Sequence, residues 1–160
     1  MAADSPIEDI LYDLKAWLAS KVPTNLRAIE TERADGMVLA DPVLYEVSDA
    51  DPWGQVSYPV VLIYPTEVPI ISDLDSGHDE GQLQAEILVA ISDGSPSEGT
   101  KRTLRYIEAI REAIRDDRTM TNKVNIMFTT RLIYYPTDPD SAGIRIATIG
   151  VDIRKILDRY

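Results

Sequence analysis

Apolar residues at three- and four-residue steps predict an amphipathic helix in the second half of the chain. It follows Ser97, a candidate N-cap, and its apolar stripe consists of Leu104, Ile107, Ile110 and Ile114. The pattern corresponds to about five helical turns of 3.6 residues each. Such a stripe must be buried against another element of the fold.

A helix is also predicted over residues 5–22. Ser5, Pro6 and Glu8 fit a capping box, with Ser at the N-cap, Pro at the first helical position and Glu at N3. Pro23 is expected to end this helix. Residues 25–33 then predict a short strand, with a helical turn as the alternative. The apolar face of the helix comprises Ile7, Ile10, Leu11, Leu14, Trp17 and Leu18.

A two-residue period predicts a β-hairpin near the C-terminus. Residues 124–131 alternate between two faces, the turn-rich segment 136–143 reverses the chain, and alternation resumes from Ile144 to Ile153. Two further strands are predicted. One covers residues 58–64 and is expected to close at Pro65, and the other covers residues 82–92.

Two stretches are predicted to be irregular. Residues 34–57 are rich in turn signals, with a weak strand at Met37–Leu39 or Val43–Val47 as the alternative. Residues 66–81 are predicted to form an extended acidic loop.

The order of elements favours a single α+β domain over residues 1–160. We expect a two-layer sandwich, in which two helices pack on one face of a four- to five-stranded, mainly antiparallel sheet. The opposite sheet face is expected to be too apolar for a lone monomer.

The chain is acidic, and its two parts differ in the sign of their charge. The formal net charge is −11; residues 1–100 hold 4 basic and 19 acidic residues, whereas residues 101–160 hold 12 basic and 8 acidic ones. This balance argues against phosphate binding by the bulk field and is compatible with a simple solubility role. It also allows copies to pair head to tail, since a heterologous interface needs two different complementary patches.

No residue pattern indicates catalysis. There is no cysteine, and the one histidine, His78, lies in a Gly- and Asp-rich segment that departs from the EF-hand calcium loop. Gly94 and Gly99 have the spacing of a phosphate-binding loop, but Thr100 separates Gly99 from Lys101, so a turn followed by a helix cap is the better interpretation. We therefore expect no enzyme, no metal and no cofactor. Neither a signal peptide nor a membrane span is expected.

Several residues are candidates for contacts with partner proteins. Arg111 and Arg115 lie off the apolar stripe of their helix among acidic residues, which favours a solvated or subunit-facing surface over a nucleic-acid-binding one. Trp53, Tyr134 and Tyr135 are candidate anchors, with ordinary edge aromatics as the alternative. The acidic segment adds apolar and carboxylate candidates that a partner could cover: Ile70, Ile71, Asp73, Asp75, Asp79 and Glu80.

The pattern as a whole resembles the tail terminator (tail completion) proteins of long-tailed bacteriophages. The capped helix Ile7–Leu18, the strand Tyr58–Tyr64, the helix Thr103–Ile114 and the hairpin Val124–Ile153 carry the resemblance, through element order rather than through a diagnostic motif. Segment 34–57 looks like an insertion relative to a minimal member.

The resemblance implies a virion structural protein without catalytic residues. It implies a homohexameric ring at the tail-neck junction, assembled in the host cytoplasm, that caps the tail tube and joins it to the head connector. DNA would pass through the lumen without specific binding, and no membrane would take part. Other head-tail connector or head-completion (neck) proteins remain an alternative. A cellular α+β domain that binds a ligand or regulates a partner is another, and a metal-dependent hydrolase using the acidic-loop carboxylates is a third.

Overall fold

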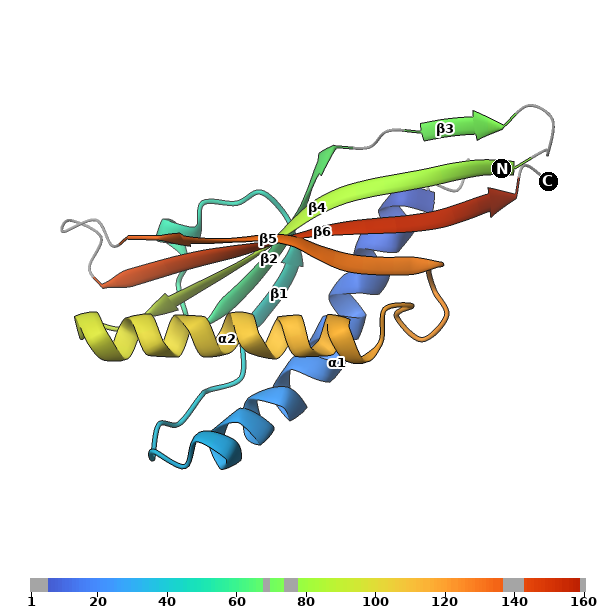
Figure 1. The fold of residues 1–160 in the computed structure, drawn as a ribbon. Coiled ribbons are helices and arrows are strands. Elements are labelled where there is room, and N and C mark those ends of the chain that lie inside the picture. Colours follow the sequence, from blue (N-terminus) through green and yellow to red (C-terminus); the bar gives the residue numbers. More distant parts are fainter. Residues whose placement is uncertain (1–5, 68–69, 74–77, 137–142, 159–160) are drawn as a thin grey trace.

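The computed structural model describes residues 6–67, 70–73, 78–136 and 143–158. It has the predicted α+β fold, in which the helices pack against a mixed sheet (Figure 1). In chain order the elements are α1 (Pro6–Arg33), β1 (Leu44–Val47), the short 3-10 helix η1 (Pro52–Gly54), β2 (Val60–Glu67), β3 (Ile70–Asp73), β4 (His78–Ser92), α2 (Pro96–Asp116), β5 (Ile126–Tyr135) and β6 (Ile144–Asp158).

The sheet has the strand order β1-β2-β4-β6-β5, and β3 pairs with β4 in addition. β1 and β2 run parallel, whereas the other paired strands are antiparallel. β5 and β6 form the predicted C-terminal hairpin. Its turn residues 137–142 lie outside the described part of the chain.

The far ends of three strands form an extension that we call the β-arm. It consists of residues 70–73 of β3, 78–81 of β4 and 155–158 of β6. β5 pairs with β6 only as far as Arg154, so β6 continues into the arm with β4 as its partner. In Figure 1 the β-arm extends past the ends of both helices.

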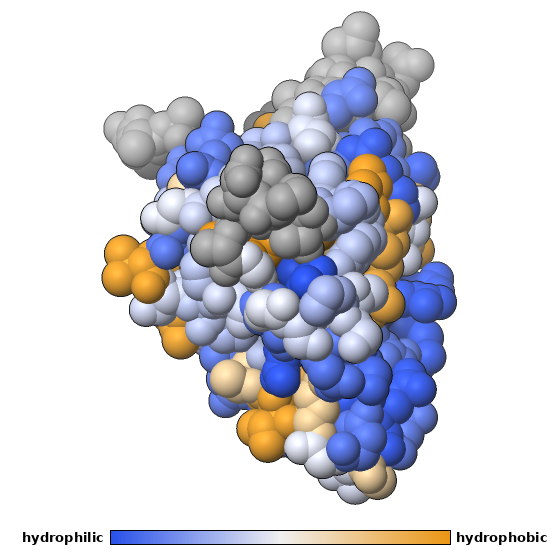
Figure 2. All heavy atoms as spheres, turned by 90° about the vertical axis from the view of Figure 1, so that its left-hand side faces the viewer, coloured by the Kyte–Doolittle hydropathy of each residue, from blue (hydrophilic) through white to orange (hydrophobic). Residues whose placement is uncertain are grey.

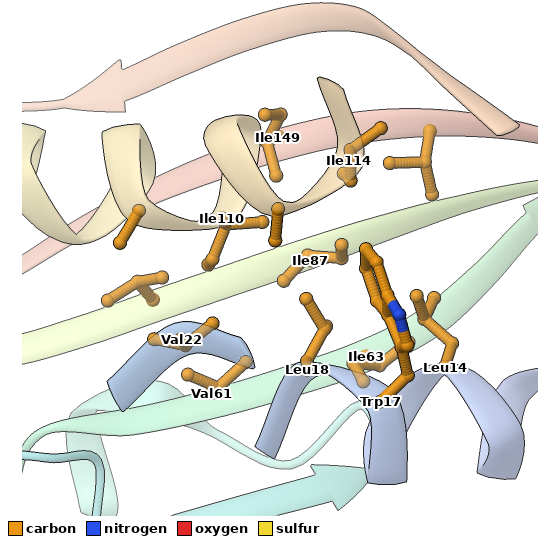
Figure 3. Close-up of a cluster of buried hydrophobic side chains, with 14 of the residues drawn as sticks. Leu14, Trp17, Leu18, Val22, Val61, Ile63, Ile87, Ile110, Ile114 and Ile149 are labelled. Atoms are coloured by element: carbon orange, nitrogen blue, oxygen red, sulfur yellow. The ribbon is translucent and has the colours of Figure 1, made fainter. Parts of the chain in front are cut away.

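One apolar core lies between the helices and the sheet. α1 contacts β1 and β2, and α2 contacts β4, β5 and β6. Figure 3 shows side chains from α1, α2, β2, β4 and β6 meeting in this core. Each fully buried aliphatic side chain contributes roughly 1.5–3 kcal/mol relative to its exposed state, which makes this layer the main source of stability. The labelled members are all buried: Leu14, Trp17, Leu18, Val22, Val61, Ile63, Ile87, Ile110, Ile114 and Ile149.

α1 continues through Pro23, where the sequence predicted its end. Val22, Leu26 and Ile29 extend the helical spacing of the apolar face and are buried. Their burial outweighs the roughly 3 kcal/mol that a proline costs inside a helix. The strand predicted over residues 25–33 is therefore wrong, and the helical alternative is confirmed.

β2 and β4 are longer than predicted. β2 passes through Pro65 to Glu67, because β1 pairs only with Val60–Ile63 and needs no N–H from residue 65. β4 begins at His78 rather than at Gln82. The segment 66–81, predicted to be a loop, therefore contains the end of β2, all of β3 and the first residues of β4.

α2 has its N-cap at Ser95 rather than at Ser97. The Ser95 hydroxyl accepts a hydrogen bond from the Glu98 N–H at 3.4 Å, and Pro96 occupies the first turn. Of the predicted stripe, Ile107, Ile110 and Ile114 are buried, but Leu104 is 43% exposed. The core-facing surface includes Thr103, Tyr106 and Ala113 instead.

The segment between α1 and β2 is partly regular. Its predicted alternative strand at Val43–Val47 is present as β1, whereas Met37–Leu39 is not a strand. Leu39 is nevertheless fully buried, so this segment contributes to the core without regular structure.

The sheet face away from the helices, which we call the open face, is less apolar than expected. Its apolar end is covered, because Ala50 and Tyr58 from the segment before β2 pack against a second small cluster. Further along, the face is polar. The buried members of this cluster are Val60, Leu62, Leu88, Ala90 and Ile146.

Candidate assembly surface

The polar part of the open face is organised around Glu86 of β4. Arg131 of β5 forms an ion pair with its carboxylate across β6, where Gly150 pairs with both residues. The Tyr64 hydroxyl donates a hydrogen bond to the same carboxylate at 2.8 Å. Burial and this carboxylate raise the pKa of Tyr64 above its usual range. Glu86 is 6% exposed, and the ion pair and the hydrogen bond hold its side chain in place on the sheet.

Asp152 extends this polar surface along β6. Its Oδ2 accepts a hydrogen bond from Gln82 Nε2 at 2.8 Å, whereas its Oδ1 is buried without a hydrogen-bond partner among the described residues. Nearby, the Arg154 guanidinium lies 5.7 Å from the centre of the Phe128 ring. A buried carboxylate oxygen without a donor is costly, so Asp152 is a destabilising position on this face.

A groove lies at the edge of the molecule between α2 and β5, and we call it the arginine groove. It has a volume of about 200 Å³. Arg115 pairs with Glu112 and lies 3.6 Å from Asp116, whereas Arg111 and Arg118 make no ion pair with any other described residue. Guanidinium groups bind carboxylates through charge-assisted hydrogen bonds, so the groove is suited to an acidic side chain. The lining residues are Arg111, Ile114, Arg115, Arg118, Phe128 and Thr129.

Acidic residues gather on the edge strand β1 and on the segment that follows it, which packs over the open face through Ala50. We call this surface the acidic edge: Glu46, Asp49, Asp51 and Trp53. No lysine or arginine occurs from residue 34 to residue 100. The three carboxylates make no ion pair within the described part of the chain, and Glu46 and Asp51 are exposed. Asp51 Oδ1 accepts a hydrogen bond from the Trp53 N–H at 2.9 Å, which holds Trp53 beside it with 40% of its surface exposed.

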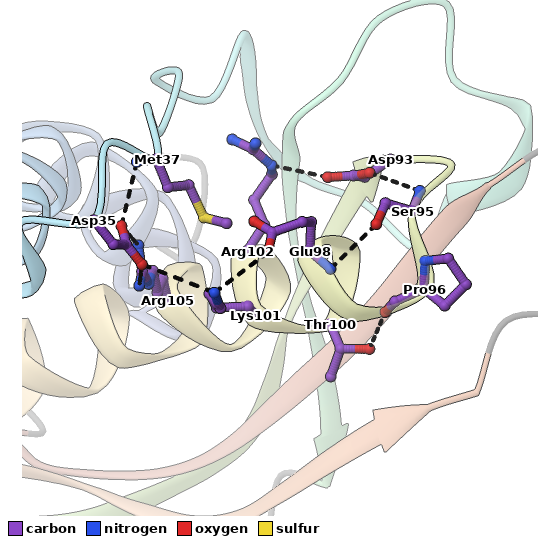
Figure 4. Close-up of polar contacts among 10 residues, drawn as sticks. All are labelled: Asp35, Met37, Asp93, Ser95, Pro96, Glu98, Thr100, Lys101, Arg102 and Arg105. Atoms are coloured by element: carbon purple, nitrogen blue, oxygen red, sulfur yellow. Dashed lines mark hydrogen bonds and ion pairs between the residues drawn. The ribbon is translucent and has the colours of Figure 1, made fainter.

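The N-terminal half of α2 is engaged by side chains of the same chain (Figure 4). Asp93 accepts hydrogen bonds from the Ser95 N–H at 2.9 Å and from Arg102 Nε at 3.1 Å. These two donors hold the pKa of Asp93 below its usual value. Arg105 similarly binds Asp35 with both terminal nitrogens and holds the pKa of that carboxyl well below its usual range. The turn and helix cap interpreted from the sequence are confirmed here.

The structure places the predicted contact residues in different regions. Arg111 and Arg115 line the arginine groove, and Trp53 belongs to the acidic edge. Tyr135 is 41% exposed at the other end of β5. Tyr134 is half-buried, and its hydroxyl lies 3.1 Å from the Thr100 hydroxyl of α2.

The remaining candidates belong to the β-arm or adjoin it. β3 contains Ile70, Ile71 and Asp73, and β4 contains Asp79 and Glu80 next to His78. Asp75 lies outside the described residues. Their role in partner contacts stays a prediction.

Sequence reasoning did not single out Glu86 or Arg131, and it placed Arg118 with Arg111 and Arg115 on the surface of the helix. Glu86 directly precedes a run of buried apolar residues, and a carboxylate in such a strand signals that a cation must lie opposite it. Identifying Arg131 as that cation requires knowing that β6 lies between β4 and β5. The sequence pattern does not indicate this strand order. Arg118 follows the helix and becomes part of a groove only through Phe128 of β5.

Figure 2 shows the molecule from the end at which α2 begins. On this side apolar side chains stand in separate groups among polar ones rather than in one continuous patch. Exposed apolar residues occur singly on ordinary protein surfaces, so they define no docking site by themselves.

Comparisons with known proteins find similarity among solved structures alone. No protein-family model matches the chain, and no curated protein matches it significantly. Among solved structures, a chain of the "Virion of native gene transfer agent (GTA) particle" is 14% identical, with a TM-score of 0.46. The similarity covers 87% of this chain and 94% of that chain.

None of the described helices is long and apolar enough to cross a membrane. The described residues also include no group of three or more His, Cys, Asp or Glu side chains that could hold a metal ion.

Proposed function

We propose that this protein is a virion structural protein of a tailed phage or a phage-like particle. In this proposal six copies form a ring that ends the tail tube and joins it to the head connector. One side of the ring complements the tube and the other side complements the connector. The work is geometric, without a catalytic step, a metal or a cofactor.

The β-arm is the observation that carries this proposal. This three-stranded ribbon extends past both helices, and neither of the two described helices covers it. The β-arm therefore allows the subunit to contact molecules that lie beyond its own core. A ring that must contact a tube on one side and a connector on the other needs such an extension.

Two further features support the proposal. The observed order of helix, strands, helix and hairpin keeps the elements on which the resemblance to tail terminators rests. The net charge of −11 suits a ring through which DNA must pass without being held, because an acidic surface repels phosphates.

Native mass measurement and electron microscopy of the purified protein with purified tail tubes test the proposal. We expect a closed ring of six subunits that caps one tube end and stops its growth. A monomer or dimer at high protein concentration that leaves tubes uncapped would favour the cellular-domain alternative. A ring found away from the tube end in assembled particles would favour another neck protein.

Shortening the β-arm tests its part in joining. Replacing residues 70–81 by Asn-Gly removes β3 and the first four residues of β4, which together make up most of the β-arm, and joins the remaining chain by a tight turn. We expect unchanged thermal unfolding but a loss of tube capping of at least ~10-fold in apparent affinity, or about 1.4 kcal/mol. Normal capping by the shortened chain would show that the β-arm is not needed to cap the tail tube.

A further inference from the structure

We infer that neighbouring copies meet head to tail, with the acidic edge of one copy bound at the arginine groove of the next. This inference rests on the proposed ring and names the contact that would build it. The ligand of the arginine groove is therefore a set of carboxylates on a second copy of this chain.

The two surfaces lie at opposite ends of the sheet. β1, which carries Glu46, is the first strand in the sheet order, and β5, which carries Phe128 and Thr129, is the last. A contact between two different surfaces of identical subunits is heterologous, and it closes into a ring when the rotation between copies permits. Surfaces at opposite edges of one sheet suit such a repeated contact.

The charges that the chain leaves unpaired are complementary at these two edges. Arg111 and Arg118 lack an ion-pair partner among the described residues, and so do Glu46, Asp49 and Asp51. Other described arginines are already neutralised within their own chain: Arg27, Arg33, Arg102, Arg105 and Arg131. Arg154 has no ion-pair partner among the described residues either and lies over the Phe128 ring, so within the described part of the chain the arginine groove brings together two unpaired guanidinium groups beside a third.

The apolar parts of the two surfaces also correspond. The arginine groove has Phe128 and Ile114 in its wall, and the acidic edge presents Trp53. Arginine stacks on aromatic rings, and an aromatic side chain seated in a groove is a common anchor of protein interfaces. Trp53 thus gives the acidic edge an anchor as well as charge.

A nucleic acid is the less suitable ligand for this groove. Glu112 and Asp116 stand beside Arg115 and offset its charge, and the whole chain is strongly acidic. A phosphate backbone would meet these carboxylates along its length, whereas a few carboxylates on a neighbouring copy need only the two unpaired arginines.

Charge reversal tests the contact in the full chain. One variant carries Arg111→Glu and Arg118→Glu, a second carries Glu46→Lys and Asp49→Lys, and a third combines all four substitutions. Asp51 is left unchanged because it caps η1. The matched control is Lys15→Glu with Lys21→Glu on α1, which changes net charge as much as the first variant does. Sedimentation measures assembly, and thermal unfolding checks that each chain folds.

We expect the first two variants to need at least ~10-fold more protein to assemble, because like charges then face each other across the contact. The combined variant restores complementarity and should assemble as the wild type does. The control should leave assembly unchanged, and added salt should weaken wild-type assembly.

The outcomes separate the contact from the function. Three results would contradict the contact and leave the proposed function standing. They are assembly that persists in both charge-reversal variants, an equal loss of assembly in the control, and no recovery of assembly in the combined variant. Assembly that depends on both edges but never caps a tail tube overturns the function and leaves the contact. A wild-type chain that stays monomeric at high concentration would contradict both the contact and the proposed function. Binding of duplex DNA that is lost in the variant with Arg111→Glu and Arg118→Glu would show that the groove binds nucleic acid instead of a second copy.

Discussion

Arg131 reaches over Gly150 to the carboxylate of Glu86, so that an ion pair joins β5 to β4 across the strand between them. The glycine makes the crossing possible. A Cβ atom at residue 150 would lie 2.6 Å from Thr130 Oγ1 and 3.0 Å from Arg131 Cγ. The open face therefore depends on one small residue to bring the two charges together.

Removing Arg131 should destabilise the protein more than neutralising Glu86. Arg131→Ala leaves a carboxylate that is 6% exposed without its cation, and we expect a loss of about 1–3 kcal/mol in the free energy of unfolding. Glu86→Gln keeps a hydrogen-bonding group and should cost less. Urea unfolding of both variants and of the double variant measures the coupling. Equal costs for the two single variants would contradict a buried charge pair.

Ile110→Asp should prevent folding. Ile110 is fully buried, and an unpaired carboxylate there costs several kcal/mol, which is comparable to the whole stability of a small domain. Leu104→Asp, on the same helix but 43% exposed, is the matched control and should fold normally. Circular dichroism and thermal unfolding distinguish the two, and a cooperatively melting Ile110→Asp protein would refute the assignment of the core.

Gly99→Ala should destabilise the protein although alanine favours helices. A Cβ at residue 99 would lie 2.0 Å from Arg145 Nε, and Arg145 is itself buried. We expect this overlap to cost about 1–3 kcal/mol, against a gain in helix propensity of about 1 kcal/mol. Gly94→Ala meets no atom within 4 Å and is the control. Chemical unfolding should show a loss for the first variant alone.

Asp93 should contribute to stability at neutral pH and not in strong acid. The Ser95 N–H and Arg102 lower the pKa of Asp93 in the folded state, below the value of about 3.9 expected in the unfolded chain. A carboxyl with a lowered folded pKa stabilises the protein above the unfolded pKa and loses this contribution as pH falls through the folded pKa. Asp93→Asn should therefore cost about 1–2 kcal/mol at pH 7. The difference from wild type should shrink below about pH 4. A difference that is the same at both pH values would show that the charge of Asp93 is not involved.

The fold could be predicted from the sequence where local periodicity and burial agree. The prediction was correct for Ile107, Ile110 and Ile114, because their helical spacing puts them on the face of α2 that is buried. Leu104 was misplaced because a three- or four-residue step also fits the margin of the stripe. Pro23 was read as a helix end because its local cost is visible in the sequence, whereas the burial of Leu26 that offsets it is not.

The candidate site was less accessible to sequence reasoning. Arg111 and Arg115 could be recognised as surface arginines, but the groove also needs Phe128, which comes from a strand ten or more positions later in the chain. The relation between Glu46 and the arginine groove depends on strand order. β1 pairs parallel to β2 at one end of the sheet, and no local pattern indicates which strand will lie at the other end.

The pairing of β4 with β6 has a mechanical consequence. Each strand is 15 residues long, and their antiparallel hydrogen bonds lie perpendicular to the strands. A pull along the strand direction loads these hydrogen bonds in shear and all together, whereas a pull perpendicular to the strands at one end breaks them one pair at a time. The subunit is therefore stiff in one direction and easily opened in another. The direction of a pulling force relative to β4 and β6 therefore decides whether this strand pair resists the force or separates.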